Sequence, residues 1–342
     1  MSEALLAIDV GGSTSRAYLV DKAGRCLGLG RNRGGNPASN DPSEAAAAII
    51  SAVEAAIVDA GSPSLDVVIA LIALAGPRVR VALATLETAF RGLGLRGEIV
   101  FGSDLLAMFA SASEAENGYC VVAGTGAGVV RVRGGAIDRV VDANGWLLGD
   151  SGSGYWLGHQ AARAAVADLD HRGPQTALTP AVLASLGIEW SEARAPNSRP
   201  LPLSRLVDAI YAMRPIELAR FAPLVIAHRA DTVAGELLTK AERFLVDDFA
   251  AAFDSSNRGP VALGGGVMPH LTGVAGGIAE ILRAAGHEPD IRLVTDGSVG
   301  AIVLAMRAVG LTVDAAMFTT VAASVAARAS VGRVPVAVEN GQ

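Results

Sequence analysis

The sequence predicts an α/β protein of two domains, and three observations carry this prediction. The chain has 342 residues, which is more than a single hydrophobic core usually supports. A strand, a Gly-rich turn and a returning strand occur at 5–20, and the same pattern occurs again at 119–132. After each of these hairpins, short apolar strands alternate with helical stretches, as in sheets that are covered by helices.

The first hairpin offers groups that bind phosphate and magnesium. Its apolar strand ends at Asp9, and a turn leads to the second strand at 17–20. Glycines in this turn accept positive φ, so several N–H groups can converge on an anion beside the hydroxyl groups that follow. Asp9, at the mouth of the turn, suits a hydrated Mg²⁺ ion. An ordinary hairpin is the alternative interpretation. The turn residues are Gly11, Gly12, Ser13 and Thr14.

The rest of the first half predicts a third strand and then alternating helices and strands. The third strand covers 25–30, and the loop after it presents Asn36 between Gly35 and Pro37. This amide suits a small polar ligand, although a plain turn asparagine fits equally well. Helices are expected at 42–60 and 78–93, and strands at 67–75 and 98–101.

Three polar turns follow strands of this half. Asp9, Gly76 and Asp104 each come at or just after the end of a predicted strand. Because α/β sheets bind ligands at the carboxyl ends of their strands, these residues are expected to face one crevice. Asp104 lies between a strand and a helix, so it also has the position of a helix N-cap.

The second half repeats the hairpin. The strand 119–123 leads into the turn 124–128, and a returning strand follows at 129–132. Two such turns suit a polyphosphate that is held from both sides, with chance recurrence as the alternative. A polar loop at 144–154 then enters a helix at 155–169, and its many glycines allow a ligand to approach the backbone. A long capped connection is the other interpretation of this loop.

A third glycine-rich segment follows the strand at 261–263. It consists of Gly264, Gly265 and Gly266, and a helix is predicted at 267–285. A strand, glycines and a helix N-terminus together hold nucleotide phosphate or ribose, although glycines also allow close packing of a helix on a strand. The remaining prediction is helical over most of 176–253 apart from a loop at 192–202, with a strand at 291–294 and helices from 297 and over 315–329.

Composition excludes several classes of protein. The net charge is −6 and no cluster of Lys and Arg marks a nucleic-acid surface, so no nucleic-acid partner is expected. The longest clean apolar run, 67–75, is too short for a membrane span. No basic-then-apolar leader opens the sequence, so a cytoplasmic protein is expected. Cys26 and Cys120 lie in predicted strands without metal-binding spacing, which predicts buried free thiols.

Seven motifs, in order along the chain, resemble those of the N-acetylglucosamine kinase family. They are DVGGSTS at 9–15, Gly-Asn-Pro at 35–37, Ala-Gly at 75–76, Ser-Asp at 103–104, AGTGAG at 123–128, GDSGSGYWLG at 149–158 and ALGGG at 262–266. That family lies within the BadF/BadG-type ATPases, which share the fold of actin, sugar kinases and Hsp70.

The resemblance implies two actin-like, ribonuclease H-like domains with a nucleotide cleft between them. The first domain would cover 1–115 and be joined by a returning helix at 297–312. The second would cover 116–296 and carry a helical insertion, and 313–342 would form a C-terminal helix and tail. The mean hydropathy of this chain is positive, which suggests a possible homodimer.

The resemblance also implies an ATP-dependent kinase that phosphorylates an amino sugar at its 6-hydroxyl. Asp104 would be the catalytic base and Asp9 would orient Mg²⁺. The ATP ligands would be Gly11, Gly12, Ser13, Thr14, Thr125, Gly126, Ala227, Gly264, Gly265 and Gly266. The sugar ligands would be Asn36, Asp104, Ala127, Gly128, Asn144, Gly145 and Asp150.

The sequence departs from the family pattern at two places, and two other functions remain open. Ala143-Asn144-Gly145-Trp146 stands where the family usually has Gly-Gly-Trp-Gly, and Pro77-Arg78 replaces a small residue and an acid. The sugar therefore stays open between N-acetylglucosamine, glucosamine and a related hexose. One alternative function is an ATP-driven activator of a reductase or dehydratase, and the other is a sugar sensor without turnover.

Overall fold

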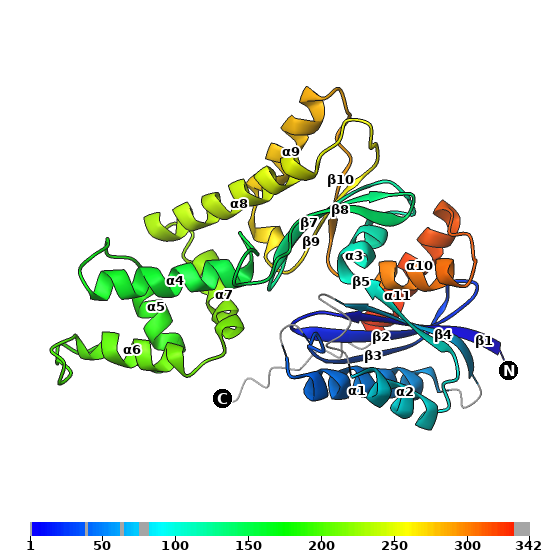
Figure 1. The fold of residues 1–342 in the computed structure, drawn as a ribbon, viewed down its shortest axis with the longest axis horizontal. Helices are drawn as coiled ribbons and strands as arrows, with labels where there is room; N and C mark the ends of the chain where they lie inside the picture. The colour runs from blue at the N-terminus through cyan, green and yellow to red at the C-terminus, as the bar shows by residue number, and fades with distance from the viewer. Residues whose placement is uncertain (1, 38–39, 62–64, 75–81, 332–342) are drawn as a thin grey trace, which may run out of the picture. The chain divides into compact units, whose positions relative to one another are not determined.

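The computed structural model describes residues 2–37, 40–61, 65–74 and 82–331, and its chain divides into two compact units. Unit 1 consists of Met1–Ala115 and Asp296–Gln342, and unit 2 consists of Glu116–Thr295. Figure 1 shows a sheet with flanking helices in each of them. The chain therefore leaves unit 1 once and returns to it near its C-terminal end.

Unit 1 contains a five-stranded sheet in the order β3-β2-β1-β4-β5. Its strands are β1 (Ser2–Val10), β2 (Thr14–Asp21), β3 (Cys26–Arg33), β4 (Leu65–Leu74) and β5 (Glu98–Ser103). The first three form an antiparallel meander, and β4 and β5 run parallel to β1. The central strands β1 and β4 are apolar because helices cover both faces of the sheet.

Two groups of helices cover this sheet (Figure 1). One face packs on α1 (Pro42–Ala60) and α2 (Leu83–Gly92), whose Ile49 and Leu86 are buried against it. The other packs on α3 (Asp104–Ala112), α10 (Ser298–Ala308) and α11 (Ala315–Val331). Asp41 caps α1 by accepting from the Ser43 N–H at 2.9 Å.

Unit 2 repeats the strand topology of unit 1. Its sheet has the order β10-β9-β6-β7-β8. The strands are β6 (Gly118–Ala123), β7 (Ala127–Arg133), β8 (Ala136–Asp142), β9 (Val261–Gly264) and β10 (Ile291–Val294). Here β6, β7 and β8 form the antiparallel meander, and β9 and β10 run parallel to β6.

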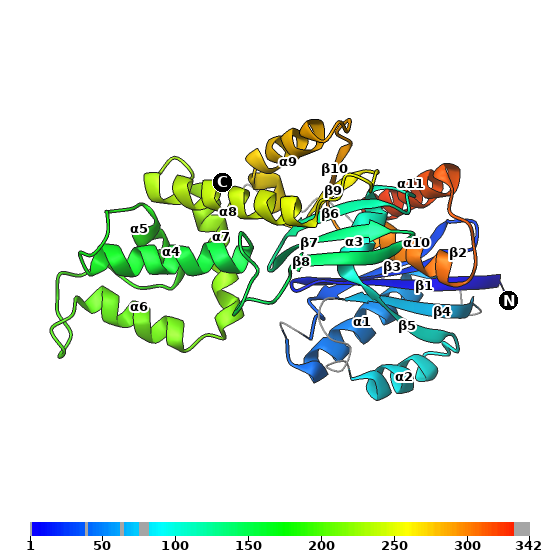
Figure 2. The same cartoon turned by 45° about the horizontal axis from the view of Figure 1, so that its top comes forward.

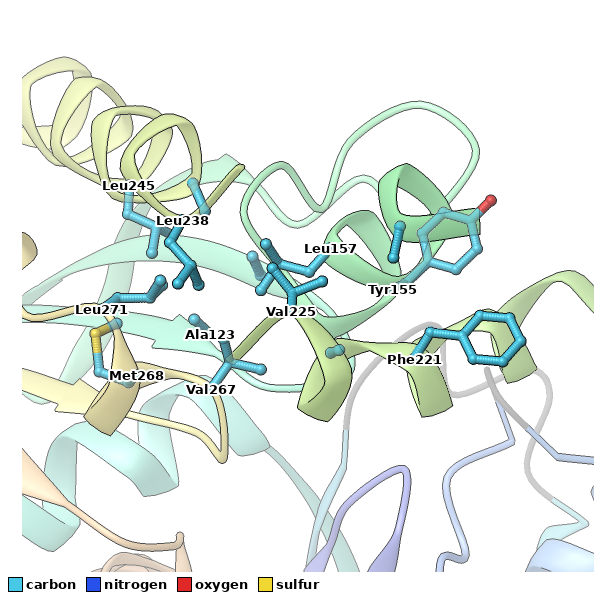
Figure 3. Packing of buried hydrophobic residues seen from close by; sticks show 14 of the residues in the cluster. Ala123, Tyr155, Leu157, Phe221, Val225, Leu238, Leu245, Val267, Met268 and Leu271 are labelled. Atoms are coloured by element: carbon cyan, nitrogen blue, oxygen red, sulfur yellow. The ribbon is translucent and has the colours of Figure 1, made fainter. Parts of the chain in front are cut away.

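The helices of unit 2 pack on this sheet and on one another (Figure 2). They are α4 (Gly154–Leu169), α5 (Leu178–Ser185), α6 (Leu201–Tyr211), α7 (Ala222–Ala227), α8 (Thr232–Ala252) and α9 (Gly273–Ala284), with 3₁₀ turns η2 (Pro215–Phe221) and η3 (Met268–His270). Figure 3 shows Val225 of α7 and Val267 close to Ala123 at the end of β6. The apolar core of unit 2 therefore supports the turn that follows β6.

The structure corrects three local predictions. The helix predicted at 267–285 begins at Gly273, because the 3₁₀ turn η3 with Pro269 comes first. The strand β8 was not predicted, because Asp138 and Arg139 interrupt its apolar residues and leave no apolar run. Cys26 is half-buried rather than buried, whereas Cys120 is buried as predicted. Ala75, Gly76 and the first residues of the helix predicted at 78–93 lie outside the described residues.

Candidate functional site

The strand register of unit 1 brings Asp9 and Asp104 to the same edge of the sheet. Val10 pairs with Leu74 of β4, and Leu74 pairs with Ser103 of β5. Asp9 lies near the end of β1 and Asp104 directly after β5. These parallel strands are two positions apart in the sheet, a spacing of about 10 Å between strand axes. Asp9 and Asp104 thus share one edge of the sheet. The expected crevice stays a prediction, and Gly76 lies outside the described residues.

The turn between β1 and β2 leaves two backbone N–H groups available. The Gly11 N–H donates to the Thr14 carbonyl at 2.9 Å and closes the turn. Among the described residues, the N–H groups of Gly12 and Ser13 have no protein acceptor. A Cβ atom on Gly34, which follows β3, would overlap the Gly12 carbonyl. Gly34 thus packs against the carbonyl of Gly12. The two consecutive N–H groups of the turn remain for an anion.

Asp9 is a buried carboxylate beside a cation and another carboxylate. Its residue is 7% exposed, and its Oδ2 lies 3.4 Å from Nη1 of Arg16. Nε of Arg16 lies 3.5 Å from Oδ2 of Asp296. Burial, and then the charge of Asp296, raise the pKa of Asp9 to about 7, while Arg16 and the Gly297 N–H lower it. Arg16, Asp296 and Gly297 were not among the predicted site residues.

Asp104 is the first residue of α3 and a half-buried carboxylate. Its Oδ1 accepts from the Leu105 N–H at 2.9 Å. The N-cap of α3 is Ser103, whose hydroxyl accepts from the Leu106 N–H, so Asp104 is not the cap. Burial raises the pKa of Asp104 to about 6. A carboxylate with this pKa is ionised at neutral pH and accepts a proton more readily than an ordinary aspartate.

Asn36 is buried in the loop that follows β3. The residue is 6% exposed, and its carbonyl accepts from both nitrogens of Asn40 at 3.0 Å. Gly34 and Gly35 pack closely before it, since a Cβ on Gly35 would lie 2.7 Å from the Ser15 hydroxyl. Asn36 therefore belongs to a fixed loop that rests on the first hairpin.

The turn between β6 and β7 also leaves two N–H groups available. The carbonyls of Gly124 and Thr125 accept from the N–H groups of Gly154 and Tyr155, at 2.7 and 3.1 Å. Among the described residues, the N–H groups of Thr125 and Gly126 have no protein acceptor. The start of α4 thus binds the carbonyl side of the turn, and the N–H side remains for an anion.

One carboxylate, that of Asp142, organises the loop between β8 and α4. Its oxygens accept from the N–H groups of Asn144 at 3.4 Å, Asp150 at 2.8 Å and Ser151 at 2.9 Å. A Cβ on Gly149 would overlap its Oδ1. Asp142, Ala143 and Asp150 all have positive φ, as does Gly145. Such strained backbone is typical of functional loops.

Sequence reasoning missed Asp142, although an aspartate at the start of a Gly-rich loop is a signal for this kind of turn.

The predicted sugar residues of unit 2 gather on this loop and on β7. Asp150 is 8% exposed, and its Oδ1 accepts from the Ala127 N–H at 3.2 Å. The Ala127 N–H thus holds Asp150, and the expected place of Ala127 at the sugar edge of the hairpin stays a prediction. Gly128 packs against Ala143 of the loop, and Asn144 is exposed. Burial raises the pKa of Asp150, while the N–H groups of Ala127 and Gly145 lower it.

The third glycine segment lies directly beside the second hairpin. Gly265 has a φ of +96°, and a Cβ there would overlap the Ala123 carbonyl. A Cβ on Gly266 would meet no atom of the described residues within 4 Å, so this glycine borders open space among them. The segment leads into η3, so it does not stand at the N-terminus of the α-helix that was predicted after it.

Ala227 ends α7 on the same side of unit 2. Two residues later, Arg229 donates from Nη2 to the carbonyl of His270 at 3.0 Å. This bond ties the end of α7 to η3 and hence to the glycine segment. This bond joins the residues just after Ala227 to those just after the three glycines, and a shared nucleotide site for them stays a prediction.

A family profile matches residues 6–305 of this chain. The chain belongs to the BadF/BadG/BcrA/BcrD ATPase family. The match spans both hairpins, Asp104, the Asp142 loop and the glycine segment. Among the described residues of this family member, no helix is long and apolar enough to cross a membrane.

Individual relatives of this ATPase are sugar kinases by name. An N-acetylmuramic acid/N-acetylglucosamine kinase from Clostridium acetobutylicum is 24% identical over 233 residues, which are 64% of this chain and 71% of that protein. A provisionally assigned N-acetylglucosamine kinase from Chromobacterium violaceum has a solved structure that is 25% identical, with a TM-score of 0.69, covering 89% of this chain and 99% of that one.

Another solved structure, a ROK family glucokinase from Streptomyces griseus, is 19% identical with a TM-score of 0.51, covering 89% of this chain and 99% of that one. At this identity the likeness concerns the fold alone. It agrees with the two mixed five-stranded sheets of this chain, which form the two-domain actin-like ATPase fold.

Proposed function

We propose that this ATPase is a sugar kinase that transfers the γ-phosphate of ATP to the 6-hydroxyl of an amino sugar such as N-acetylglucosamine or glucosamine. The single observation that carries the proposal is the arrangement at the edge of the unit 1 sheet. There, Asp104 with a pKa of about 6 shares the edge with Asp9 and with the N–H groups of Gly12 and Ser13, which have no protein acceptor in the described part of the chain. The curated kinase relative supports the same chemistry.

The ATP-binding groups in this proposal are mostly backbone N–H groups. Gly12 and Ser13 in unit 1, and Thr125 and Gly126 in unit 2, each offer N–H groups that suit phosphate oxygens. Gly11 and Thr14 close the first turn and keep these groups convergent. Ala227 and the segment Gly264, Gly265 and Gly266 are proposed to border the adenosine, because Gly266 leaves open space in the segment beside the second hairpin.

Asp9 fits a magnesium ion that keeps most of its water. Mg²⁺ in phosphoryl-transfer sites is held by one or two carboxylates together with phosphate oxygens and water. Among the described residues, no three acidic, His or Cys side chains group together as a metal site, so Asp9 would hold the ion together with phosphate oxygens and water. When bound, the ion neutralises charge on the phosphates.

Asp104 is proposed to accept the proton of the sugar hydroxyl. As the hydroxyl oxygen bonds to the γ-phosphorus, its proton passes to a carboxylate oxygen of Asp104, and the bond to the ADP oxygen breaks. Phosphoryl transfer depends mainly on the alignment of the reacting groups and on neutralisation of phosphate charge. The protein therefore needs to supply only one general base. The sugar itself is proposed to bind Asn36, Asn144, Gly145 and Asp150, with Ala127 and Gly128 beside them.

The test is a panel of acceptors with purified protein and Mg-ATP. ADP release and sugar phosphate are both measured with N-acetylglucosamine, glucosamine, N-acetylmuramic acid and glucose. The proposal expects equal amounts of ADP and sugar 6-phosphate with at least one amino sugar. ATP hydrolysis without any sugar phosphate contradicts the kinase and favours an ATP-driven activator. Sugar binding without ADP release favours a sensor.

A further inference from the structure

Arg16 joins two carboxylates that come from distant parts of the chain. It lies on β2 directly after the first turn, and its side chain is 25% exposed. Nη1 lies 3.4 Å from Oδ2 of Asp9, and Nε lies 3.5 Å from Oδ2 of Asp296. Asp296 is the residue at which the chain returns to unit 1. One guanidinium therefore links the end of β1 to the segment that precedes α10.

The backbone around Asp296 fixes the position of this carboxylate. Its Oδ1 accepts from the Ser298 N–H at 3.0 Å, at the start of α10. A Cβ on Gly297 would lie 2.8 Å from Oδ1 of Asp9, so the chain passes directly against the Asp9 carboxylate. A Cβ on Gly300 would overlap the Ala107 carbonyl of α3. The start of α10 therefore packs closely against Asp9 and against α3.

Two neighbouring carboxylates repel each other, and a cation between them offsets this repulsion. Arg suits this place because its planar guanidinium presents several N–H donors in a fixed fork, which can reach two carboxylates at once. Lys carries a compact charge on a flexible stem and cannot reproduce the same two directions.

We infer that Arg16 is a positioning residue that holds the Asp9 carboxylate in the orientation it needs for Mg-ATP, and that ties this orientation to the start of α10 through Asp296. The inference depends on the proposed function in one respect, namely that Asp9 faces the magnesium of Mg-ATP. Arg16 acts through Asp9 and makes no essential contact with the phosphates.

The first test measures ATP binding by calorimetry, with Mg²⁺ or with EDTA and without any sugar. The variants are Arg16→Met and Arg16→Lys. The matched control is Arg25→Met. Its arginine side chain is 74% exposed and pairs with Asp21, which lies at the opposite end of β2 from Arg16. The wild type and the control should bind ATP more tightly with Mg²⁺ than with EDTA.

Arg16→Met should lose about 10–100-fold of affinity with Mg²⁺, the usual effect of removing a partner of a metal ligand. Its affinity in EDTA should stay unchanged, and Arg16→Lys should lie between Arg16→Met and the wild type. An equal loss in EDTA would mean that Arg16 binds phosphate directly, which overturns the inference. Unchanged affinity of Arg16→Met with Mg²⁺ overturns it as well.

The second test needs neither ATP nor sugar, so it is independent of the kinase proposal. Arg16→Met and Asp296→Asn are combined in a double-mutant cycle of thermal unfolding. Coupled effects are expected, because each variant removes the same link. Additive effects overturn the link between Arg16 and Asp296. If Mg²⁺ does not tighten ATP binding even in the wild type, the proposed role of Asp9 fails, and the metal-positioning role of Arg16 fails with it.

Discussion

The two hairpins of this ATPase have the same topology but different chemistry around their turns. Each lies between the first two strands of a five-stranded sheet with the same connections. Each leaves two consecutive N–H groups without a protein acceptor among the described residues. The turn of unit 1 is surrounded by the charges of Asp9, Arg16 and Asp296, whereas the turn of unit 2 is held by backbone bonds to the start of α4.

This difference teaches that a repeated anion-binding turn need not have a repeated function. Unit 1 combines its turn with Asp104 and with a carboxylate suited to magnesium, so it carries the proposed chemistry. Unit 2 places beside its turn the loop that Asp142 holds together, so it carries the proposed positioning of substrate. Substitutions in unit 1 should therefore change kcat, and substitutions in the loop of unit 2 should change KM.

The largest expected effect is that of Asp104→Asn. Removal of a general base lowers kcat by about 10²–10⁴-fold. ATP binding measured by calorimetry should be retained.

The same variant should also change stability. The pKa of Asp104 is raised in the folded protein, so between pH 3.8 and about 6 the folded protein keeps a proton that the unfolded chain has released. The ionised carboxylate therefore destabilises the fold at higher pH. The Tm of Asp104→Asn at pH 8 should therefore equal or exceed that of the wild type.

Near-normal turnover of Asp104→Asn would remove Asp104 from the mechanism and would break the assignment of chemistry to unit 1. Ser103→Ala is the matched control, because it removes the cap of α3 and leaves the carboxylate in place. It should cost about 1 kcal/mol of stability and little turnover.

The next effect is a dependence of activity on pH. A base must be ionised to accept a proton, so kcat/KM for the sugar should rise through the Asp104 pKa of about 6. Below that pH the value should fall by about tenfold per unit. The measurement uses saturating Mg-ATP, because Asp9 also has a raised pKa. A flat profile between pH 5 and 7 is the contrary outcome.

A smaller effect is expected for Asp142→Ala, which tests the role given to unit 2. Three backbone N–H groups would lose their acceptor, and each lost bond costs about 1 kcal/mol. The KM for the sugar should rise about tenfold or more, while the KM for ATP and kcat change little. Asp142→Asn, which keeps one acceptor oxygen, should lie between this variant and the wild type. A selective fall in kcat would show that the loop takes part in the chemical step.

Most strands and both turns of the fold could be predicted from the sequence, because apolar runs and glycine turns are local signals. Asp9 and Asp104 could also be predicted to share an edge, since the direction of parallel strands fixes where they end. Arg16 and Asp296 could not be predicted, because their roles depend on a contact between separate segments. Asp142 was missed, although its contacts lie within one loop and its place at the start of a Gly-rich segment is a local signal. The exposed strand β8 and the 3₁₀ turn before α9 were missed because neither has a distinct apolar pattern.

The smallest effect concerns stability at two neighbouring glycines beside the second hairpin. Gly265→Ala should destabilise unit 2, because the residue has a φ of +96° and its new Cβ would overlap the Ala123 carbonyl. Such backbone strain costs about 1–3 kcal/mol, which lowers the Tm by several degrees. Gly266→Ala is the matched control, since its Cβ would meet no atom of the described residues within 4 Å and its stability should stay near that of the wild type.

The same control variant tests the proposed adenosine site. If Gly266→Ala weakens ATP binding at unchanged Tm, the nucleotide occupies the open space at this glycine. If ATP binding is unchanged as well, the proposed adenosine side must lie elsewhere in unit 2, and the comparison of the two hairpins would then rest on the phosphate groups alone.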